Sequence, residues 1–294
     1  MKRVGSILFA LPLLAGVAGC GRRDRIVVGA KNFTESDLLA EIVAQQIERR
    51  AGGGLQVERR YHLGGTFVCH EAILSGQIGM YVEYTGTAFT AVLKYPPVPS
   101  RDSVYRTVSA EYARRFHLVW LPPFGFNNTF AIVVRDSDAV RHGLRTISDV
   151  APLAPQWKAG FGYEFLERAD GFQGLSRVYG LRFAGAPTAM DLGLTYRALA
   201  DGKVDLIAGN STDGQIAALG LRSLDDDRHY FPPYEAAVVA RSDLLQRHPE
   251  VARALGELAG KLSDSTMRQL NADADVRHRD IADIAREWLA RQVP

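Results

Sequence analysis

Cys69 and His70 are adjacent residues of the types that act as nucleophile and base in some enzymes. Neighbouring positions on a helix do not face each other, so this pair is poorly placed for nucleophilic catalysis. The chain contains no G-x-S-x-G, P-loop, H-E-x-x-H or C-x-x-C motif, and its seven histidines are dispersed without metal-ligand spacing. The sequence therefore predicts no enzymatic activity and no cofactor or metal.

Three aromatic residues, Tyr84, Phe130 and Tyr234, lie at the edges of expected strands or where the chain is expected to cross between lobes. Aromatic residues at such positions usually pack in a core. Their faces also attract a quaternary ammonium, which has no N–H to donate, through the negative quadrupole of the ring. Lys31 and Arg168 could bind a carboxylate, although a single cation is usually a solvated surface charge. The residue types alone leave both interpretations open.

The first twenty residues are typical of an exported lipoprotein. Lys2 and Arg3 precede an apolar run at 7–17, which is too short to cross a bilayer as a helix. The sequence VAGC at 17–20 fits a lipobox. We expect residues 1–20 to be a signal peptide with its lipobox, and Cys20 to be acylated; the alternative is an ordinary secretory signal with an incidental cysteine. Acylation would leave Cys69 as the only free thiol, so no intrachain disulfide could form.

The remaining chain of about 270 residues is long enough for one or two domains with buried cores. Hydrophobic residues make up 47% of the sequence and charged residues 23%, and the net charge of +2 is too small and too dispersed for a nucleic-acid surface. Short apolar runs alternate with helical patterns, and four helices follow the last expected strand at 236–240. Alternation of this kind predicts an α/β fold with parallel-rich sheets.

The chain resembles the glycine betaine/choline/carnitine substrate-binding proteins of ABC importers, the OpuAC/ProX-like family. Each matching stretch is weak alone, but all six occur in order, with nearly invariant spacing from Tyr84 onward. They are VGAKNFTE at 28–35, LGGT at 63–66, EYTGTA at 83–88, GFNNTFA at 125–131, STDG at 211–214 and FPPY at 231–234. A further stretch, EFLERADG at 164–171, carries Arg168.

The resemblance implies a type II periplasmic-binding-protein fold, with two α/β lobes, a ligand cleft between them and two crossover hinge segments. Lobe one would comprise residues 25–127 and 235–294, and lobe two residues 128–234. The lobes would close on the ligand by hinge motion, without covalent chemistry.

The resemblance also implies an aromatic box for a quaternary ammonium, formed by Tyr84, Phe130, Asn210 and Tyr234, with Asn128 nearby. Phe130 and Asn210 stand where the family commonly has tyrosine, and Asn128 replaces a common aspartate. The box is therefore incomplete by the betaine pattern.

Lys31 and Arg168 match positions that hold the carboxylate of a betaine. Choline would leave both cations unpaired, so they favour a zwitterion. Thr87 and Thr66 are polar helpers near a helix N-terminus, where backbone N–H groups favour anions.

We therefore expect a monomeric, membrane-anchored lipoprotein on the periplasmic or cell-surface face, which binds glycine betaine or a related zwitterion and delivers it to an ABC permease. Bulkier betaines such as ergothioneine, and choline or carnitine, stay open as ligands. A ligand-sensing lipoprotein and an enzyme acting on a choline-like compound are weaker alternatives.

Overall fold

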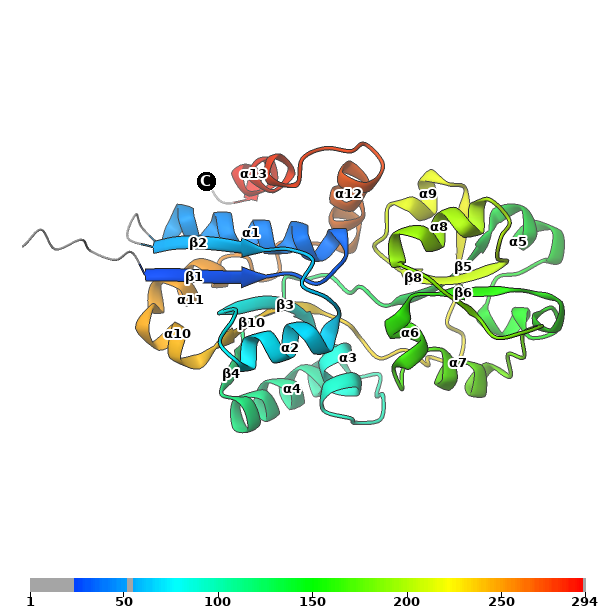
Figure 1. The fold of residues 1–294 in the computed structure, drawn as a ribbon, viewed down its shortest axis with the longest axis horizontal. Helices are drawn as coiled ribbons and strands as arrows, with labels where there is room; N and C mark the ends of the chain where they lie inside the picture. The colour runs from blue at the N-terminus through cyan, green and yellow to red at the C-terminus, as the bar shows by residue number, and fades with distance from the viewer. Residues whose placement is uncertain (1–23, 52–54, 293–294) are drawn as a thin grey trace, which may run out of the picture.

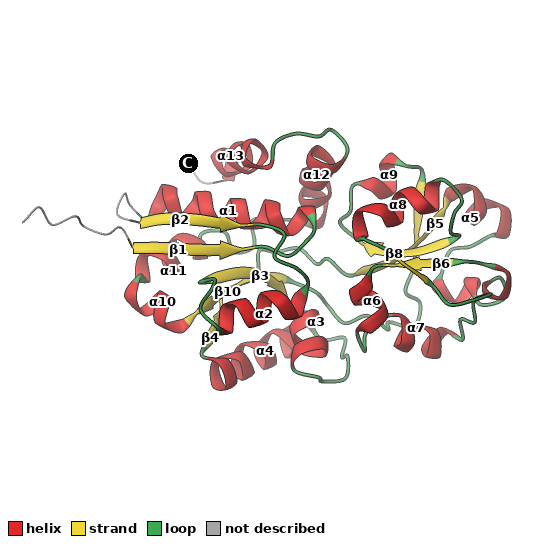
Figure 2. Cartoon of the chain, viewed as in Figure 1, coloured by secondary structure: helices red, strands yellow, loops and turns green. Residues whose placement is uncertain are grey.

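The computed structural model describes residues 24–51 and 55–292 of the chain. Cys20 and the expected signal peptide lie outside the described residues. The described part forms two lobes side by side, each with strands inside and helices on the outer faces (Figures 1 and 2). No described helix combines the length and the apolar character needed to cross a membrane.

Lobe one is built on a five-stranded sheet in the order β2-β1-β3-β10-β4. The strand β1 runs parallel to β2 and β3, whereas β10 is antiparallel to β3 and β4. The strands are β1 (Asp24–Gly29), β2 (Leu55–Arg60), β3 (Met80–Tyr84), β4 (Leu118–Trp120) and β10 (Ala236–Arg241). The last of these returns from the far end of the sequence, so lobe one is discontinuous in the chain.

Helices cover both faces of this sheet. The helices of the first half are α1 (Thr34–Arg50), α2 (Thr66–Leu74), α3 (Thr85–Thr87), a π-helical turn η1 (Ala88–Val92) and α4 (Arg101–Phe116). The closing helices are α10 (Ser242–Arg247), α11 (Pro249–Gly256), α12 (Asp264–Asp275) and α13 (Ile281–Gln292). All of β3 and most of α1 are buried, as expected for a strand and a helix at the centre of the lobe.

Lobe two is built on a second five-stranded sheet in the order β7-β6-β8-β5-β9. Its strands are β5 (Phe130–Arg135), β6 (Ala159–Phe161), β7 (Thr188–Ala189), β8 (Leu206–Asn210) and β9 (Leu221–Leu224). Its helices are α5 (Asp136–His142), η2 (Ile147–Val150), η3 (Ala154–Gln156), α6 (Tyr163–Glu167), α7 (Phe172–Tyr179), α8 (Leu192–Ala200) and α9 (Gln215–Ala218).

Two segments, 121–129 and 225–235, connect the lobes and lie side by side. Asn127 pairs with Glu235 in an isolated antiparallel bridge, and the Asn128 N–H donates to the Tyr234 carbonyl at 3.0 Å. The predicted boundaries at 128 and 234 fall within these segments. This architecture confirms the predicted type II fold with two α/β lobes.

Gly86 in α3 shows why the second crossing segment can approach lobe one so closely. A Cβ at this position would lie 2.7 Å from the Pro233 carbonyl oxygen and from the Tyr234 ring. Only glycine avoids this overlap. The close approach holds Tyr234 against the end of β3.

The sequence missed one element of lobe two. The sequence pattern predicts a strand followed by a helix over 204–219. The strand β8 and the short helix α9 lie in this range, and the unpredicted strand β9 follows at Leu221–Leu224. The segment LRSL has no strong alternation of apolar and polar residues, and β9 is an edge strand that pairs only with β5. The segment forms a strand because it pairs with β5 at the edge of the sheet, and its own sequence pattern does not predict one.

Candidate ligand-binding site

A cavity of about 190 Å³ lies where the two lobes meet. Its lining contains residues from the ends of β1, β3 and β8 and the start of β5, so it lies at the strand ends where α/β folds bind ligands. All eight residues predicted to bind ligand line it: Lys31, Tyr84, Thr87, Asn128, Phe130, Arg168, Asn210 and Tyr234. The structure thus brings the predicted residues together, and their role in holding a solute stays a prediction.

Tyr84, Phe130 and Tyr234 reach the cavity because each lies at a strand end or next to one. Tyr84 is the last residue of β3, Phe130 the first of β5, and Tyr234 lies two residues before β10. The rings of Phe130 and Tyr234 are 5.7 Å apart between centroids and inclined at 74°, an edge-to-face contact that fixes both planes.

Three further aromatic residues, Phe33, Tyr163 and Phe165, line the same cavity. The Phe33 ring lies 6.3 Å from Tyr84, and Phe165 lies 4.8 Å from Phe130 in an edge-to-face contact. The aromatic lining of the cavity therefore extends beyond the three rings of the predicted box. Phe33 lies within the 28–35 stretch and Phe165 within the 164–171 stretch. Their position beside Lys31 and Arg168 in these stretches was the sequence feature that could have identified them.

The ring faces of the predicted box already lie against cations of the protein. The Lys31 ammonium is 5.4 Å from the centre of the Tyr84 ring. The Arg168 guanidinium is 5.0 Å from the centre of Phe130 and 6.0 Å from that of Tyr234. All three distances are within the range of cation–π attraction. The cleft is therefore a place where aromatic faces stabilise positive charge.

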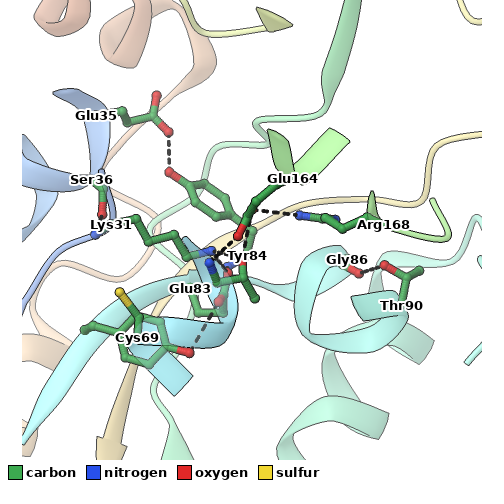
Figure 3. A network of polar contacts seen from close by, with 12 residues as sticks. Lys31, Glu35, Ser36, Cys69, Glu83, Tyr84, Gly86, Thr90, Glu164 and Arg168 are labelled. Carbon is green, nitrogen blue, oxygen red and sulfur yellow. Dashed lines mark hydrogen bonds and ion pairs between the residues drawn. The ribbon is translucent and has the colours of Figure 1, made fainter. Parts of the chain in front are cut away.

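Lys31 is buried and bonded within lobe one (Figure 3). Its ammonium donates to the Glu83 carboxylate at 2.5 Å and to the Thr66 hydroxyl at 2.9 Å. Glu83 is fully buried in the middle of the sheet, so the ion pair satisfies two charges that would otherwise be costly. The expectation that Lys31 is an unpaired cation is wrong, because its charge is compensated by Glu83.

Arg168 has a carboxylate partner too. Its Nε and Nη2 atoms donate to the two oxygens of Asp170 at 2.9 and 2.6 Å, in a bidentate pair. Burial alone would raise the pKa of Asp170, but the charge and hydrogen bonds of Arg168, with the hydrogen bonds from Thr90 and Tyr234, together lower it. Burial alone would lower the pKa of Arg168, and Asp170 reverses that shift, so the pKa is raised. The argument that unpaired cations require a zwitterionic ligand therefore fails at both positions.

Asp170 also joins the two lobes. It accepts from the Thr90 hydroxyl of lobe one at 2.7 Å and from the Tyr234 hydroxyl at 2.6 Å. Thr90 and Asp170 are both buried. Arg168, Asp170 and Tyr234 thus form one network, which sets the Tyr234 ring plane.

A second buried carboxylate, Glu35, also joins the lobes and accepts the hydroxyl of Tyr84. This residue is not among the site residues predicted from the sequence. Its carboxylate accepts from Tyr84 at 2.6 Å, from Asn128 at 2.7 Å, from Thr212 of lobe two at 2.5 Å and from Asn271 at 2.6 Å. No ion pair to Glu35 is found within the described residues. Burial raises its pKa, and the four hydrogen bonds oppose the shift. We call Glu35 and these four partners the Glu35 hub.

Asn128 and Asn210 use their amides for structure as well as lining the cavity. Asn128 donates to Glu35 and accepts from the Thr212 N–H at 3.4 Å. Asn210 donates to Asp213 through its backbone N–H at 2.9 Å and its side chain at 3.1 Å. Burial raises the pKa of Asp213 to about 7.

A second hollow of about 440 Å³ adjoins the cavity and shares Phe33, Asp191 and Asn210 with it. Because Asn210 is smaller than the tyrosine expected there, no ring at this position separates the two spaces.

Thr87 is buried beside the cavity, and Thr66 lies at the first residue of α2. Cys69 is buried in α2, and burial raises the pKa of its thiol to about 12, so it is a poor nucleophile. His70 contacts Tyr112 and Phe116 edge-on rather than Cys69. Within residues 24–51 and 55–292, no group of histidine, cysteine and carboxylate side chains could hold a metal ion.

Comparison with known proteins gives the same family as the sequence motifs. The family of substrate-binding domains of ABC-type glycine betaine transport systems matches residues 24–291. The carnitine transport binding protein OpuCC of Listeria monocytogenes is 34% identical over 280 residues, which cover 95% of this chain and 90% of that protein. The ergothioneine transport permease/ergothioneine binding protein EgtU of Helicobacter pylori is 32% identical over 90% of this chain but only 47% of that protein.

A solved structure described as a glycine betaine/carnitine/choline ABC transporter has a TM-score of 0.75 at 32% identity, covering 90% of this chain and 98% of that one. The chain therefore belongs to the family of substrate-binding domains of ABC-type glycine betaine transport systems. Its relatives are transport binding proteins rather than enzymes.

Proposed function

We propose that this protein binds a betaine-type quaternary-ammonium solute, such as glycine betaine, in the cleft and delivers it to an ABC permease. The observation that carries the proposal is that Tyr84, Phe130 and Tyr234 line one cavity, and that their faces lie within about 6 Å of a cation in this structure. A trimethylammonium would use the same faces, at roughly 0.5–2 kcal/mol per ring once water is excluded.

Arg168 offers the remaining donors for a ligand carboxylate. Its Nε and Nη2 bind Asp170, whereas its Nη1 has only a longer contact, at 3.8 Å, with Glu164. A carboxylate held by Nη1 would lie beside the rings that hold the ammonium. A compact zwitterion would use Nη1 in competition with the Glu164 carboxylate.

A bulkier betaine is the second candidate. The second hollow, which shares Asn210 with the cavity, offers space for a side group beyond the trimethylammonium. One relative is named as an ergothioneine binding protein. A tyrosine at position 210 would fill space between the cavity and the second hollow, so an Asn210→Tyr variant should bind ergothioneine more weakly and glycine betaine about equally.

We further propose that the protein is a monomer anchored through acylated Cys20 on the periplasmic or cell-surface face, with lobe boundaries at 128 and 234. Changing Cys20→Ser should then release it from the membrane fraction. A wild-type protein that is wholly soluble and carries no lipid mass on its N-terminus would contradict the anchor.

Thermal unfolding with added solutes tests the binding proposal. Glycine betaine, carnitine, choline and ergothioneine are each added to the purified protein at rising concentration. A true ligand stabilises the folded state by mass action, by about 2.7 kcal/mol at one hundred times its dissociation constant. Absence of stabilisation by all four solutes would contradict a quaternary-ammonium ligand.

A further inference from the structure

Glu164 places a carboxylate between the two cations that were predicted to hold the ligand. It lies in the first turn of α6 in lobe two and reaches across to α2 of lobe one (Figure 3). One oxygen accepts from the Thr66 backbone N–H, and the other lies 3.2 Å from the Thr66 hydroxyl and 3.8 Å from Arg168 Nη1. The same hydroxyl accepts from the Lys31 ammonium at 2.9 Å.

The surroundings of this carboxylate are those of an anion site. Thr66 is fully buried, and it is the first residue of the nine-residue helix α2. Its N–H therefore has no acceptor within the helix and can donate to an anion. A Cβ on Gly65 would lie 2.1 Å from the Glu164 carboxylate oxygen, so only glycine permits the approach. A helix N-terminus, a buried ammonium one hydroxyl away and a guanidinium therefore converge on one carboxylate.

The two cations near the site, Lys31 and Arg168, already have carboxylate partners and do not require the carboxylate of a ligand. Glu83 compensates Lys31, and Asp170 compensates Arg168, so Glu164 adds a negative charge that no closer cation cancels. A ligand carboxylate in the same place would meet Glu164 as a like charge. A solute with positive charge and no carboxylate would leave the Glu164 contacts intact.

We propose that Glu164 is a specificity-determining residue, whose carboxylate occupies the position that the carboxylate of a betaine would take. The inference rests on the proposed function. A betaine must displace Glu164 from Thr66 to use this subsite, whereas a carboxylate-free cation such as choline binds with Glu164 in place. Glu164 therefore shifts selectivity away from zwitterions, and removing its charge shifts selectivity toward them.

Calorimetry with matched solutes tests this inference on the full-length protein in detergent. Dissociation constants for glycine betaine and choline are measured for wild type, Glu164→Gln and Glu164→Ala. Glu167→Gln is the control, because Glu167 is exposed on the same short helix. We expect both Glu164 variants to raise the preference for glycine betaine over choline by about tenfold, since one like charge is removed beside the carboxylate. The control should leave the ratio unchanged.

Hydrogen exchange at the Thr66 amide gives a readout that needs no ligand. In Glu164→Ala, the peptide spanning residues 63–69 should exchange faster than in wild type or Glu167→Gln, because the Thr66 N–H loses its acceptor. If exchange is unchanged, or if solutes bind but their ratio stays within twofold of wild type, the inference is overturned. If no solute binds even wild type, the proposed function fails, and the exchange experiment alone decides whether Glu164 occupies the site.

Discussion

Glu35 and Asp170 are two buried carboxylates that join the lobes in the same geometric way. Glu35 reaches from lobe one to Thr212 of lobe two, and Asp170 reaches from lobe two to Thr90 of lobe one. Each also accepts the hydroxyl of one cavity tyrosine, Tyr84 for Glu35 and Tyr234 for Asp170.

Their electrostatic environments are opposite. Asp170 has a bidentate guanidinium, and its pKa is lowered, whereas Glu35 has four neutral donors and no ion pair among the described residues, and its pKa is raised. Both interfaces between the lobes are thus made by hydrogen bonds, one to a carboxylate that an ion pair within lobe two keeps ionised, and the other to an acid that burial favours in its neutral form. The two should respond differently to charge removal and to pH.

The largest expected effect comes from removing the cation of the Asp170 network. Arg168→Ala leaves a buried carboxylate without its counterion, so the free energy of unfolding should fall by about 3–5 kcal/mol. Arg222→Ala removes an arginine from an exposed pair with Asp136 and should cost less than about 1 kcal/mol. Urea unfolding of the three proteins measures both. Equal, small losses in the two variants would show that Asp170 does not depend on Arg168.

Ligand affinity should depend on both tyrosines, because each network fixes one ring of the box. Tyr84→Ala and Tyr234→Ala should each weaken binding of the best quaternary-ammonium ligand by about 1–3 kcal/mol. Tyr95→Ala, which removes a half-buried ring outside the cavity lining, should leave affinity unchanged. Calorimetry on folded variants gives the dissociation constants. If neither cleft variant loses affinity, Tyr84 and Tyr234 do not contact the ligand and only pack in the core.

Opposite pH dependences should distinguish the two acids. The raised pKa of Glu35 means that its stabilising contribution is complete below the ordinary pKa of 4.5 and is lost as pH rises through the folded-state pKa. The lowered pKa of Asp170 means that its contribution is present above 3.8 and is lost as pH falls.

The cost of Glu35→Gln should therefore shrink as pH rises from 4.5, while the cost of Asp170→Asn should shrink as pH falls below about 4. Denaturant unfolding at pH 3, 4.5 and 7 follows both. If the two costs change with pH in the same direction, the contrast between the networks is wrong.

The sequence predicted the lobes and the cavity-lining residues better than the electrostatics. The order of strands and helices follows from apolar periodicity and family motifs. Seven of the eight predicted residues line the cavity because they are near strand ends or the crossings, and Arg168 reaches it from the end of α6. The partners of Lys31 and Arg168 were missed. Glu83 is 52 positions from Lys31, and only the pairing of β1 with β3 brings them together. Asp170 lies two residues from Arg168, but sequence spacing does not reveal that both side chains are buried together.

The smallest effects concern the two tyrosine hydroxyls. Tyr84→Phe and Tyr234→Phe keep the ring faces, so ligand affinity should change little. Both substitutions should lower the free energy of unfolding, but by different amounts. Tyr234→Phe removes a donor from a carboxylate that is ionised at neutral pH, and hydrogen bonds to charged groups contribute about 1.5–3 kcal/mol. Tyr84→Phe removes one of four donors from Glu35 and leaves the other three in place, so its cost should be nearer the roughly 0.5–1.5 kcal/mol of an ordinary hydrogen bond.

Tyr234→Phe should therefore be the more destabilising substitution at pH 7, and the difference between the two should narrow as the pH falls and Asp170 becomes protonated. Thermal and urea unfolding at pH 7 and pH 3 measure this difference, because the lowered pKa of Asp170 keeps it ionised at pH 4. Tyr105→Phe provides the control, since its hydroxyl donates to the Leu121 carbonyl at 3.3 Å, outside both networks. A larger loss in Tyr84→Phe than in Tyr234→Phe at pH 7 would mean that Glu35 is ionised and that the hub is held by charge after all.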